Sequence, residues 1–478
     1  MKIQSQLILW HRYLGIATCL LFAMWFATGI VMMYVRMPSL TPQERMDALP
    51  PLDPARVRLS VSEAVAKAEI GTAPQSITLT SIFDQPVYRI QVPGGLVTVF
   101  ADDGQVLTEF EWPEVVPSIR PFLATGNTRW HLDATLTQPD QWTLEGEMRP
   151  LFPMYRVSVD DGRGTMLYLS SITGDVVLKT TSRSRALAWA GAIPHWLYVT
   201  AIRKHGAFWQ RLVIWVAGIC CFTSTFGLVL GLSRYSPSRR FRSPYQGAKL
   251  WHHWGGLAFG LITLTWVFSG LLSMLSNGSD PTDAQVRAFT GGDLDPAIFH
   301  LSPASVPAGA KEVGFSQVCG KPLYAVSMTA EKTVLLDGRG EVAAPFSETS
   351  LIKAAGEAVP GAGIREVSTL RDYDWYYYDR DELLPLPVLR VKFNDPQSTW
   401  LYIDPARGAL LARFERYTRL ERWIYHGLHS WDFPFLWRHR PWWDAVVILL
   451  LTGGLLVSIT AVVMGASRVL ASFTKLTR

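Results

Sequence analysis

Four long apolar runs without charged residues constrain this chain more than any other feature. They cover residues 14–35, 212–232, 254–275 and 445–466. An α-helix needs about 20 such residues to cross a bilayer, and each run exceeds the threshold of about 18. The first run is too long for the core of a signal peptide, and no Ala-x-Ala cleavage pattern follows it. The sequence therefore predicts four transmembrane helices, the first of which is retained.

Basic residues in the short segments predict the orientation, because positively charged short loops stay in the cytoplasm. These residues are Lys2, Arg12, Arg234, Arg239, Arg240, Arg242, Lys249, Arg468, Lys475 and Arg478. Both termini are expected inside and the two long segments outside. The predicted order is a helix in 1–35, an outside domain in 36–207, a helix in 208–233, a basic loop in 234–251, a helix in 252–276, a second outside domain in 277–443, a helix in 444–467 and a tail in 468–478. The net charge of +5 is too weak to indicate nucleic-acid binding.

The chain reads as two copies of one unit. Leu9-Trp10-His11-Arg12-Tyr13 returns 241 residues later as Leu250-Trp251-His252-His253-Trp254. Pairs separated by 234 residues are Asp140 and Asp374, Arg156 and Arg390, Tyr168 and Tyr402, His195 and His429, and Trp209 and Trp443. A long series at constant spacing is a strong repeat signal. It predicts an internal twofold repeat of helix–domain–helix, with a pseudo-twofold axis along the membrane normal.

The outside segments have the patterns of α+β domains. In the first, 61–68 has helical spacing after Ser60 as N-cap, 88–92 alternates like a strand, and 155–159 with 166–169 predicts a hairpin. In the second, 351–358 reads as a helix, 388–393 with 399–403 as a hairpin, and 404–408 as a turn. The acidic and aromatic stretch 371–382 is either a recognition surface for a ligand or an edge strand with a charged turn.

Four histidines are paired by the repeat. His11 and His252 are expected at the cytoplasmic entry of the first and third helices, and His195 and His429 outside, shortly before the second and fourth. Neutral imidazole is a strong ligand for haem iron. We therefore expect two bis-histidine b-type haems, one near each membrane surface, with these histidines as iron ligands. No Cys-x-x-Cys-His motif occurs, which excludes covalent c-type haem.

Other interpretations of these histidines stay open. A Trp-His pair at a helix start can be a simple interfacial anchor. His253 and His426 are alternative ligands or neighbours of the ligands, since residues three apart on a helix share a face. His205 and His439 lie in basic surroundings typical of headgroup or propionate contacts or of solvated surface. His131 and His300 have no partner in the repeat and are expected at the surface.

Small and basic residues complete the expected surroundings. A porphyrin needs space between the helices, and small residues would provide it. The alternative is that they serve ordinary close packing of helices. These residues are Gly15, Ala17, Gly29, Gly218, Gly255, Gly256, Gly260, Gly270, Gly453 and Gly454. The residues placed to pair with haem carboxylates are Arg12, Arg203, Lys204, Arg438 and Arg440. A positive flank is the alternative, and the better one for Arg12.

The repeated unit resembles the PepSY-associated transmembrane family of bacteria. The residues that carry the resemblance are Trp10-His11-Arg12-x-Leu14-Gly15 with Trp25 and Thr28-Gly29, Trp251-His252-x-x-Gly255, His426-x-x-His429, and the PepSY-like pieces Ser62 to Ala68 and Val391 to Gly408. The fold this implies is a membrane bundle of four helices with two α+β PepSY-like periplasmic domains, in the bacterial inner membrane.

The resemblance also implies an activity. Some family members are similar to inner-membrane ferric-siderophore reductases that carry haem, so the expected reaction is the reduction of a ferric siderophore or similar iron chelate in the periplasm, in iron uptake. Some relatives have a cytoplasmic flavoprotein module, for which the cytoplasmic segments here are too short. The expected electron donor is therefore a quinol or a separate reductase.

Two competing functions follow from the same sequence. A non-enzymatic membrane protein whose outside domains bind peptides or regulate periplasmic proteases explains the PepSY-like pieces but not the paired histidines. A transporter is less suitable, because the spans lack the intramembrane charges that such proteins use.

Overall fold

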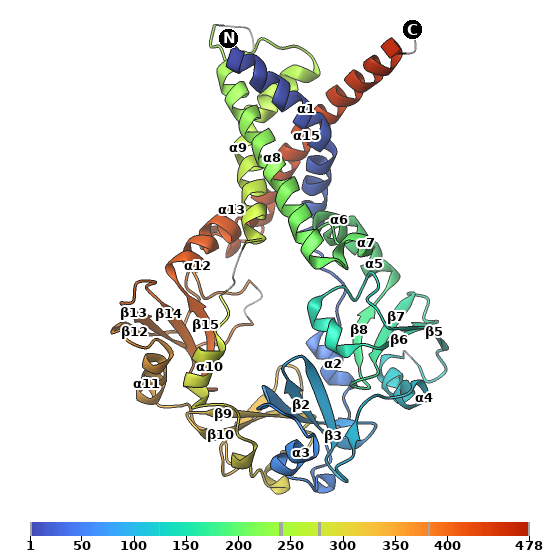
Figure 1. The fold of residues 1–478 in the computed structure, drawn as a ribbon, viewed down its shortest axis with the longest axis vertical. Coiled ribbons are helices and arrows are strands. Elements are labelled where there is room, and N and C mark those ends of the chain that lie inside the picture. The colour runs from blue at the N-terminus through green and yellow to red at the C-terminus, as the bar shows by residue number, and fades with distance from the viewer. Residues whose placement is uncertain (1, 124, 239–241, 276–278, 381–382, 477–478) are drawn as a thin grey trace. The chain divides into compact units, whose positions relative to one another are not determined.

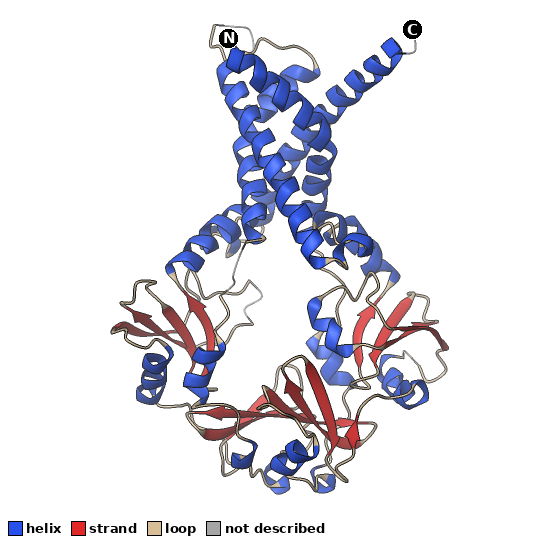
Figure 2. Ribbon diagram, viewed as in Figure 1, coloured by secondary structure: helices blue, strands red, loops and turns tan. Residues whose placement is uncertain are grey.

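The computed structural model describes residues 2–123, 125–238, 242–275, 279–380 and 383–476. It divides into two compact units that interleave along the chain. The helical unit consists of residues 1–37, 185–278 and 418–478, and the sheet unit of residues 38–184 and 279–417. Figure 1 labels the elements of both units, and Figure 2 shows that the strands belong to the sheet unit.

Four long helices form the helical unit: α1 (Lys2–Met32), α8 (Gly206–Arg234), α9 (Ala248–Ser273) and α15 (Trp442–Leu476). Each is long and apolar enough to span a membrane, which confirms the four predicted helices. They extend beyond the apolar runs, since α1 begins at Lys2 and the run at residue 14. His252 is the fifth residue of α9 and lies near its start, as expected, whereas His11 is the tenth residue of α1 and lies further inside its helix.

The four helices pack in the cyclic order α1, α8, α9, α15. This order leaves α1 and α9 diagonally opposite each other. Glycines permit the close approach of neighbours: a Cβ added at Gly255 would lie 2.7 Å from Val457, and one at Gly454 would lie 2.5 Å from the Phe26 ring. Small residues at helix interfaces serve the same purpose in membrane bundles generally.

Short helices precede the second and fourth long helices: α5 (Ser182–Ala190), α6 (Ala192–His195), α7 (Thr200–Arg203), α12 (Arg416–Glu421), α13 (Leu428–Ser430) and α14 (Pro434–Trp437). A π-helical turn, Arg422–Gly427, joins α12 to α13. Turns of this kind often occur at functional sites. This one comes directly before His429.

The sheet unit is built around a seven-stranded sheet to which both long segments contribute, in the order β11-β10-β9-β1-β2-β3-β4. Its strands are β1 (Ser76–Ile82), β2 (Gln85–Val92), β3 (Gly95–Phe100), β4 (Val106–Leu107), β9 (Glu312–Val318), β10 (Lys321–Ser327) and β11 (Thr333–Leu336). β1 pairs antiparallel with β9, with Ile77 opposite Phe315. The core beneath combines residues of both segments, including Ile90, Val99, Val313 and Tyr324.

Two four-stranded meanders complete the sheets. They are β5 (Trp130–Leu136), β6 (Met154–Val159), β7 (Thr165–Ser170) and β8 (Val176–Thr180), and β12 (Ile364–Leu370), β13 (Val388–Phe393), β14 (Trp400–Asp404) and β15 (Ala409–Phe414). The remaining helices are α2 (Pro42–Ala48), α3 (Val61–Lys67), α4 (Trp112–Val115), α10 (Asp283–Thr290) and α11 (Glu348–Ala358). The 3₁₀ helices are Pro54–Arg56, Val116–Phe122, Gly146–Leu151, Pro296–Ile298 and Pro303–Ser305.

Each meander carries the same buried polar contact. Asp140 accepts hydrogen bonds from Tyr168 at 2.8 Å and Arg156 at 3.2 Å. In the other meander, Asp374 accepts from Tyr402 and Arg390, both at 2.8 Å. Burial and the neighbouring carboxylate raise the pKa of both tyrosines, so each phenol remains a donor.

The predicted local elements in the two long segments are confirmed. Ser60 caps α3 in a capping box with Glu63, and the helix at 351–358 and both hairpins form as expected. The edge-strand alternative for 371–382 is wrong over residues 371–380, which form a loop. Arg390 and Tyr402 donate hydrogen bonds to the Asp374 side chain. These contacts fix the segment as a loop, so it does not pair with the sheet as a strand. Residues 381–382 lie outside the described part.

Candidate functional site

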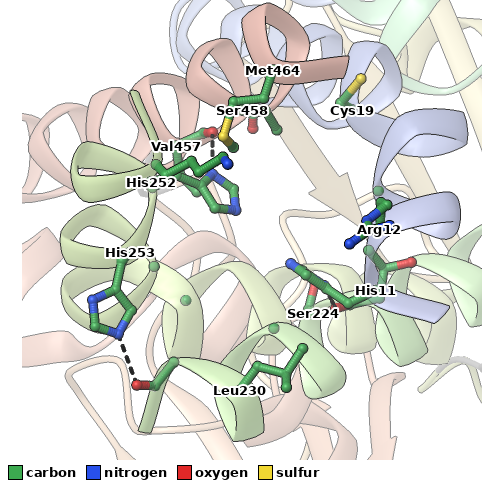
Figure 3. Close-up of a pocket in the computed structure, with 18 of the residues that line it drawn as sticks. His11, Arg12, Cys19, Ser224, Leu230, His252, His253, Val457, Ser458 and Met464 are labelled. Carbon is green, nitrogen blue, oxygen red and sulfur yellow. Dashed lines mark hydrogen bonds between the residues drawn. The ribbon is translucent and has the colours of Figure 1, made fainter. Parts of the chain in front are cut away.

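Two pairs of histidines face each other within the helical unit. The first pair is His11 on α1 and His252 on α9, from diagonally opposite helices, with ring centres 6.2 Å apart and planes inclined by 37° (Figure 3). The second pair is His195 at the end of α6 and His429 in α13, with ring centres 6.4 Å apart and planes inclined by 77°. These are the pairs that the sequence predicted.

In the first pair, backbone carbonyls fix the orientation of both rings. Nδ1 of His11 lies 3.0 Å from the Thr223 carbonyl oxygen. Nδ1 of His252 lies 3.3 Å from the Val457 carbonyl oxygen and 3.0 Å from the Thr460 hydroxyl. A carbonyl only accepts, so Nδ1 carries the proton, and in the neutral form of each ring Nε2 keeps its lone pair. His11 approaches α8 closely because position 227 is glycine, where a Cβ would lie 2.7 Å from the ring.

In the second pair, hydroxyls of α1 and α9 have the same role. The Thr28 hydroxyl lies 2.9 Å from Nδ1 of His195 and donates its own proton to the Met24 carbonyl. The Ser269 hydroxyl lies 3.1 Å from Nδ1 of His429 and donates to the Trp266 carbonyl. Each hydroxyl proton is thus engaged, so the hydroxyl oxygen accepts from Nδ1–H.

Thr28 and Ser269 stand 241 residues apart, the spacing of the repeat. Sequence reasoning quoted Thr28 only for the family resemblance and did not name Ser269, although this spacing could have found the pair. Gly29 on α1 and Gly270 on α9 are also 241 residues apart. Gly29 lies beside His195, and Gly270 lies beside His429.

Both rings of the second pair are neutral. Burial, together with the facing His429, lowers the pKa of His195 to about 3. Burial likewise lowers the pKa of His429. A buried imidazole disfavours its charged form, and the neutral form is the one that binds metals.

The ring separations fit two imidazoles on opposite sides of one metal ion. With metal–nitrogen bonds of about 2.0 Å and ring centres about 1.2 Å beyond the nitrogens, the centres would be about 6.4 Å apart. The observed separations are 6.2 and 6.4 Å. Hydrogen bonding of the second nitrogen to a carbonyl or hydroxyl is the usual support of a metal-bound histidine.

Two ligands alone do not hold a bare metal ion. Structural zinc sites use about four protein ligands, and within the described residues no group of three or more His, Cys, Asp or Glu side chains could hold a metal. Iron in a porphyrin needs only axial ligands from the protein. The donor set therefore fits haem.

A cavity of about 410 Å³ lies beside the first pair and is lined by both histidines. Gly15 and Gly256, one helical turn after His11 and His252, line it, and a Cβ at either glycine would meet nothing within 4 Å. Figure 3 shows His11 and His252 on opposite sides of this space. Gly15 and Gly256 thus leave a gap next to the rings of His11 and His252. The sequence predicted such space at both glycines.

The charged groups that line this cavity are all basic: Arg12, Lys249 and Arg468. An apolar body with two carboxylates, such as haem, suits this lining. Arg12 thus lines the cavity as well as flanking the membrane helix. Sequence reasoning did not assign Lys249 and Arg468 to the site. Arg468 comes from α15, far along the chain, but Lys249 lies three residues before His252 on α9, and this spacing could have found it.

The alternative histidines differ from the paired ones. Nδ1 of His253 lies 2.9 Å from the Ser243 hydroxyl, and its Nε2 lies 2.9 Å from the Gly231 carbonyl oxygen. Both nitrogens of His253 are thus used within the protein, which favours His252 as the ligand. The His426 ring packs edge-on against Tyr425, at 4.9 Å, and the ring that faces His195 is that of His429.

The other basic candidates lie against aromatic rings. The Arg203 guanidinium is 4.8 Å from the ring centres of both Tyr198 and Trp209, and Arg438 is 5.4 Å from that of Trp437. Arg440 lies 3.6 Å from Asp444. His205 precedes α8 as its N-cap, and Nδ1 of His439 lies 3.0 Å from the Phe435 carbonyl oxygen.

Comparison with known protein families and with curated proteins finds no match. The functional conclusion therefore depends on the geometry of the site.

Proposed function

We propose that this chain is a b-type haem oxidoreductase of the bacterial inner membrane, which passes electrons across the membrane to reduce a periplasmic ferric chelate. One haem is held by His11 and His252 and a second by His195 and His429. The observation that carries the proposal is that both pairs combine the ring separation of bis-imidazole ligation with protonated, hydrogen-bonded Nδ1 atoms.

The iron of each bound haem would accept and donate single electrons. The protein orients the four imidazoles through Thr223, Val457, Thr28 and Ser269. Arg12, Lys249 and Arg468 would offset the carboxylate charges of a haem bound at the first pair. Burial keeps water away from the rings of the second pair, so charges there interact more strongly than in water.

The two pairs lie at different depths of the bundle. Gly29 follows His11 by 18 residues on α1, and a Cβ at Gly29 would lie 3.8 Å from the His195 ring. Eighteen residues of α-helix rise about 27 Å. A buried aromatic contact between Phe26 and Trp266, with ring centres 5.7 Å apart, lies on the helices between the two levels. This contact would form part of the protein path for electrons between the two levels.

The direction of transfer follows from the proposed orientation. The first pair lies at the basic end of the helices, which the positive-inside rule places in the cytoplasm. An inside-negative potential then favours outward electron transfer by about 2.3 kcal/mol per 100 mV. A quinol or a separate reductase would supply the electrons. The sheet unit, which we propose to consist of two PepSY-like parts of a duplicated unit, would lie in the periplasm.

The acceptor that we propose is a ferric siderophore or similar iron chelate. Ferrous iron carries less charge than ferric iron, so reduction weakens the hold of an anionic chelator. Release of iron on this side of the membrane would serve iron uptake.

The test uses the full chain in sealed vesicles with a reductant trapped inside and ferric citrate outside. A ferrous-specific chromogenic chelator outside should report iron reduction with the wild-type protein. The His195→Ala variant should lose this activity, and the His131→Ala variant, altered at an exposed histidine, should keep it. Equal rates for wild-type and His195→Ala vesicles would contradict the proposal and favour a non-enzymatic membrane protein.

A further inference from the structure

A strained turn in the sheet unit opens onto a cavity. Phe83 and Asp84 connect β1 to β2, both with positive φ, at 50° and 63°. Such values are rare for residues other than glycine, above all for a bulky aromatic residue. The turn between β9 and β10 has the same conformation but uses Cys319 and Gly320, with φ of 49° and 74°.

The two turns differ in what covers them. The amides of Cys319 and Gly320 donate to the carbonyls of Phe289 and Thr290, at 2.8 Å each. These carbonyls belong to the end of α10. The close fit is completed by Gly291, where a Cβ would lie 2.6 Å from the Gly320 nitrogen.

The counterpart of α10 in the first segment does not reach its turn. α2 starts in the same way as α10, since Thr41 with Glu44 and Thr282 with Gln285 form capping boxes. The end of α2 and the residues after it, Ala48 to Pro50, are separated from the turn by a cavity of about 380 Å³ that both sides line. The amides of Phe83 and Asp84 have no hydrogen-bond partner among the described residues.

Two further donors line this cavity. Ser81 is only 2% exposed, and its hydroxyl makes no hydrogen bond to any described residue. The Arg120 guanidinium likewise has no ion pair or hydrogen bond within the described part of the chain. Apolar walls come from Ile82, Phe83, Pro117, Pro121, Phe122 and Val176.

Most of the other charges at the cavity are already paired. Asp175 forms an ion pair with Arg89, and Arg45 forms one with Glu312 at 2.5 Å. The Asp47 carboxylate accepts from Gln43 at 2.8 Å. The two charged groups at the cavity that have no partner among the described residues are the Arg120 guanidinium and the Asp84 carboxylate. The cavity thus offers unused donors where the second segment places two carbonyl oxygens.

We propose that this cavity binds a carboxylate with an apolar body. The carboxylate oxygens take the place that the Phe289 and Thr290 carbonyls occupy at the other turn. They accept from the amides of Phe83 and Asp84, and the Arg120 guanidinium pairs with the charge. The apolar body lies against the proline and phenylalanine side chains. Such a group is found both in small organic acids and at the carboxyl end of a peptide.

The experiment is isothermal titration calorimetry on the full chain in detergent, with N-acetyl-leucine and its uncharged amide as probes. The acid should bind, and the amide should bind at least about tenfold more weakly, as expected for a lost charged hydrogen bond. Arg120→Gln should weaken binding of the acid by a similar factor. Arg287→Gln, which alters an exposed arginine on α10, is the matched control and should leave it unchanged.

A second variant tests the sign of the charge. Asp84→Asn removes the remaining unpaired carboxylate while keeping a side chain that tolerates positive φ, so the acid should bind more tightly. Acetyl-Ala-Ala-Leu with a free carboxyl end separates the two sources: clearly tighter binding than N-acetyl-leucine indicates a peptide, and equal binding a small acid. Equal affinity for acid and amide, weaker binding to Asp84→Asn, or no heat from either acid would overturn the proposal.

Discussion

The two histidine pairs have nearly the same ring separation but differ in how the protein supports them. The Thr223 carbonyl holds His11, whereas the Thr28 hydroxyl holds His195. Nδ1 of His252 and Nδ1 of His429 each face one carbonyl and one hydroxyl. A cavity with basic lining adjoins the first pair. The ring geometry is thus nearly the same in both pairs, while the groups that hold the rings differ with their place in the bundle.

The largest expected effect is the loss of one haem from a ligand variant. His429→Ala should lose about half of the haem, since the second pair then has one axial ligand left. The measurement is the Soret absorbance per chain. His426→Ala is the matched control, three residues away in the same short segment, and should retain both haems. Loss of haem from His426→Ala alone would reverse the assignment.

The first pair gives the corresponding test. His252→Ala should lose the other half of the haem, and the double variant with His429→Ala should be colourless. His253→Ala should keep the full absorbance, because both nitrogens of His253 are used by Ser243 and Gly231. If His252→Ala and His429→Ala removed the same haem, the two pairs would not be separate sites.

Filling the cavity should affect only the first pair. Gly256→Leu places a side chain in open space beside His252, so the protein should fold but bind about half of the haem because the porphyrin space is taken. Gly218→Leu adds the same side chain at another helical glycine with open space, outside the cavity lining, and should bind both. Full haem content in Gly256→Leu would show that the cavity is not the haem space.

The hydrogen bonds to Nδ1 should have a smaller effect. Thr28→Val removes the hydroxyl that accepts from His195 and should weaken haem binding at the second pair by about 10- to 100-fold. Thr460→Val leaves His252 with the Val457 carbonyl, so binding at the first pair should change less. Haem loss during dilution, followed by absorbance, measures both. Equal losses would contradict the proposed difference in support.

The ring planes predict the smallest difference, a spectroscopic one. Axial imidazoles close to perpendicular make two iron d orbitals nearly equal in energy, which raises the largest g value of the low-spin ferric signal. The planes meet at 77° in the second pair and 37° in the first. Electron paramagnetic resonance should therefore show two signals, and His429→Ala should remove the one with the larger g value.

Much of this site was predictable from sequence, because the repeat spacing pairs equivalent residues. The four helices, both hairpins and the histidine partners follow from hydropathy, alternation and repeat. The pairing of β1 with β9 has no local signal, since Ile77 and Phe315 come from segments more than two hundred residues apart. Arg468 was missed for the same reason, because its place in the cavity depends on helix packing. Lys249, three residues before His252, could have been found from its spacing.

The haem content of the purified full-length protein tests whether both histidine pairs bind haem. It is measured as the pyridine haemochrome and divided by the amount of chain. We expect two non-covalent b-type haems per chain. A colourless protein after expression with ample haem supply would contradict it.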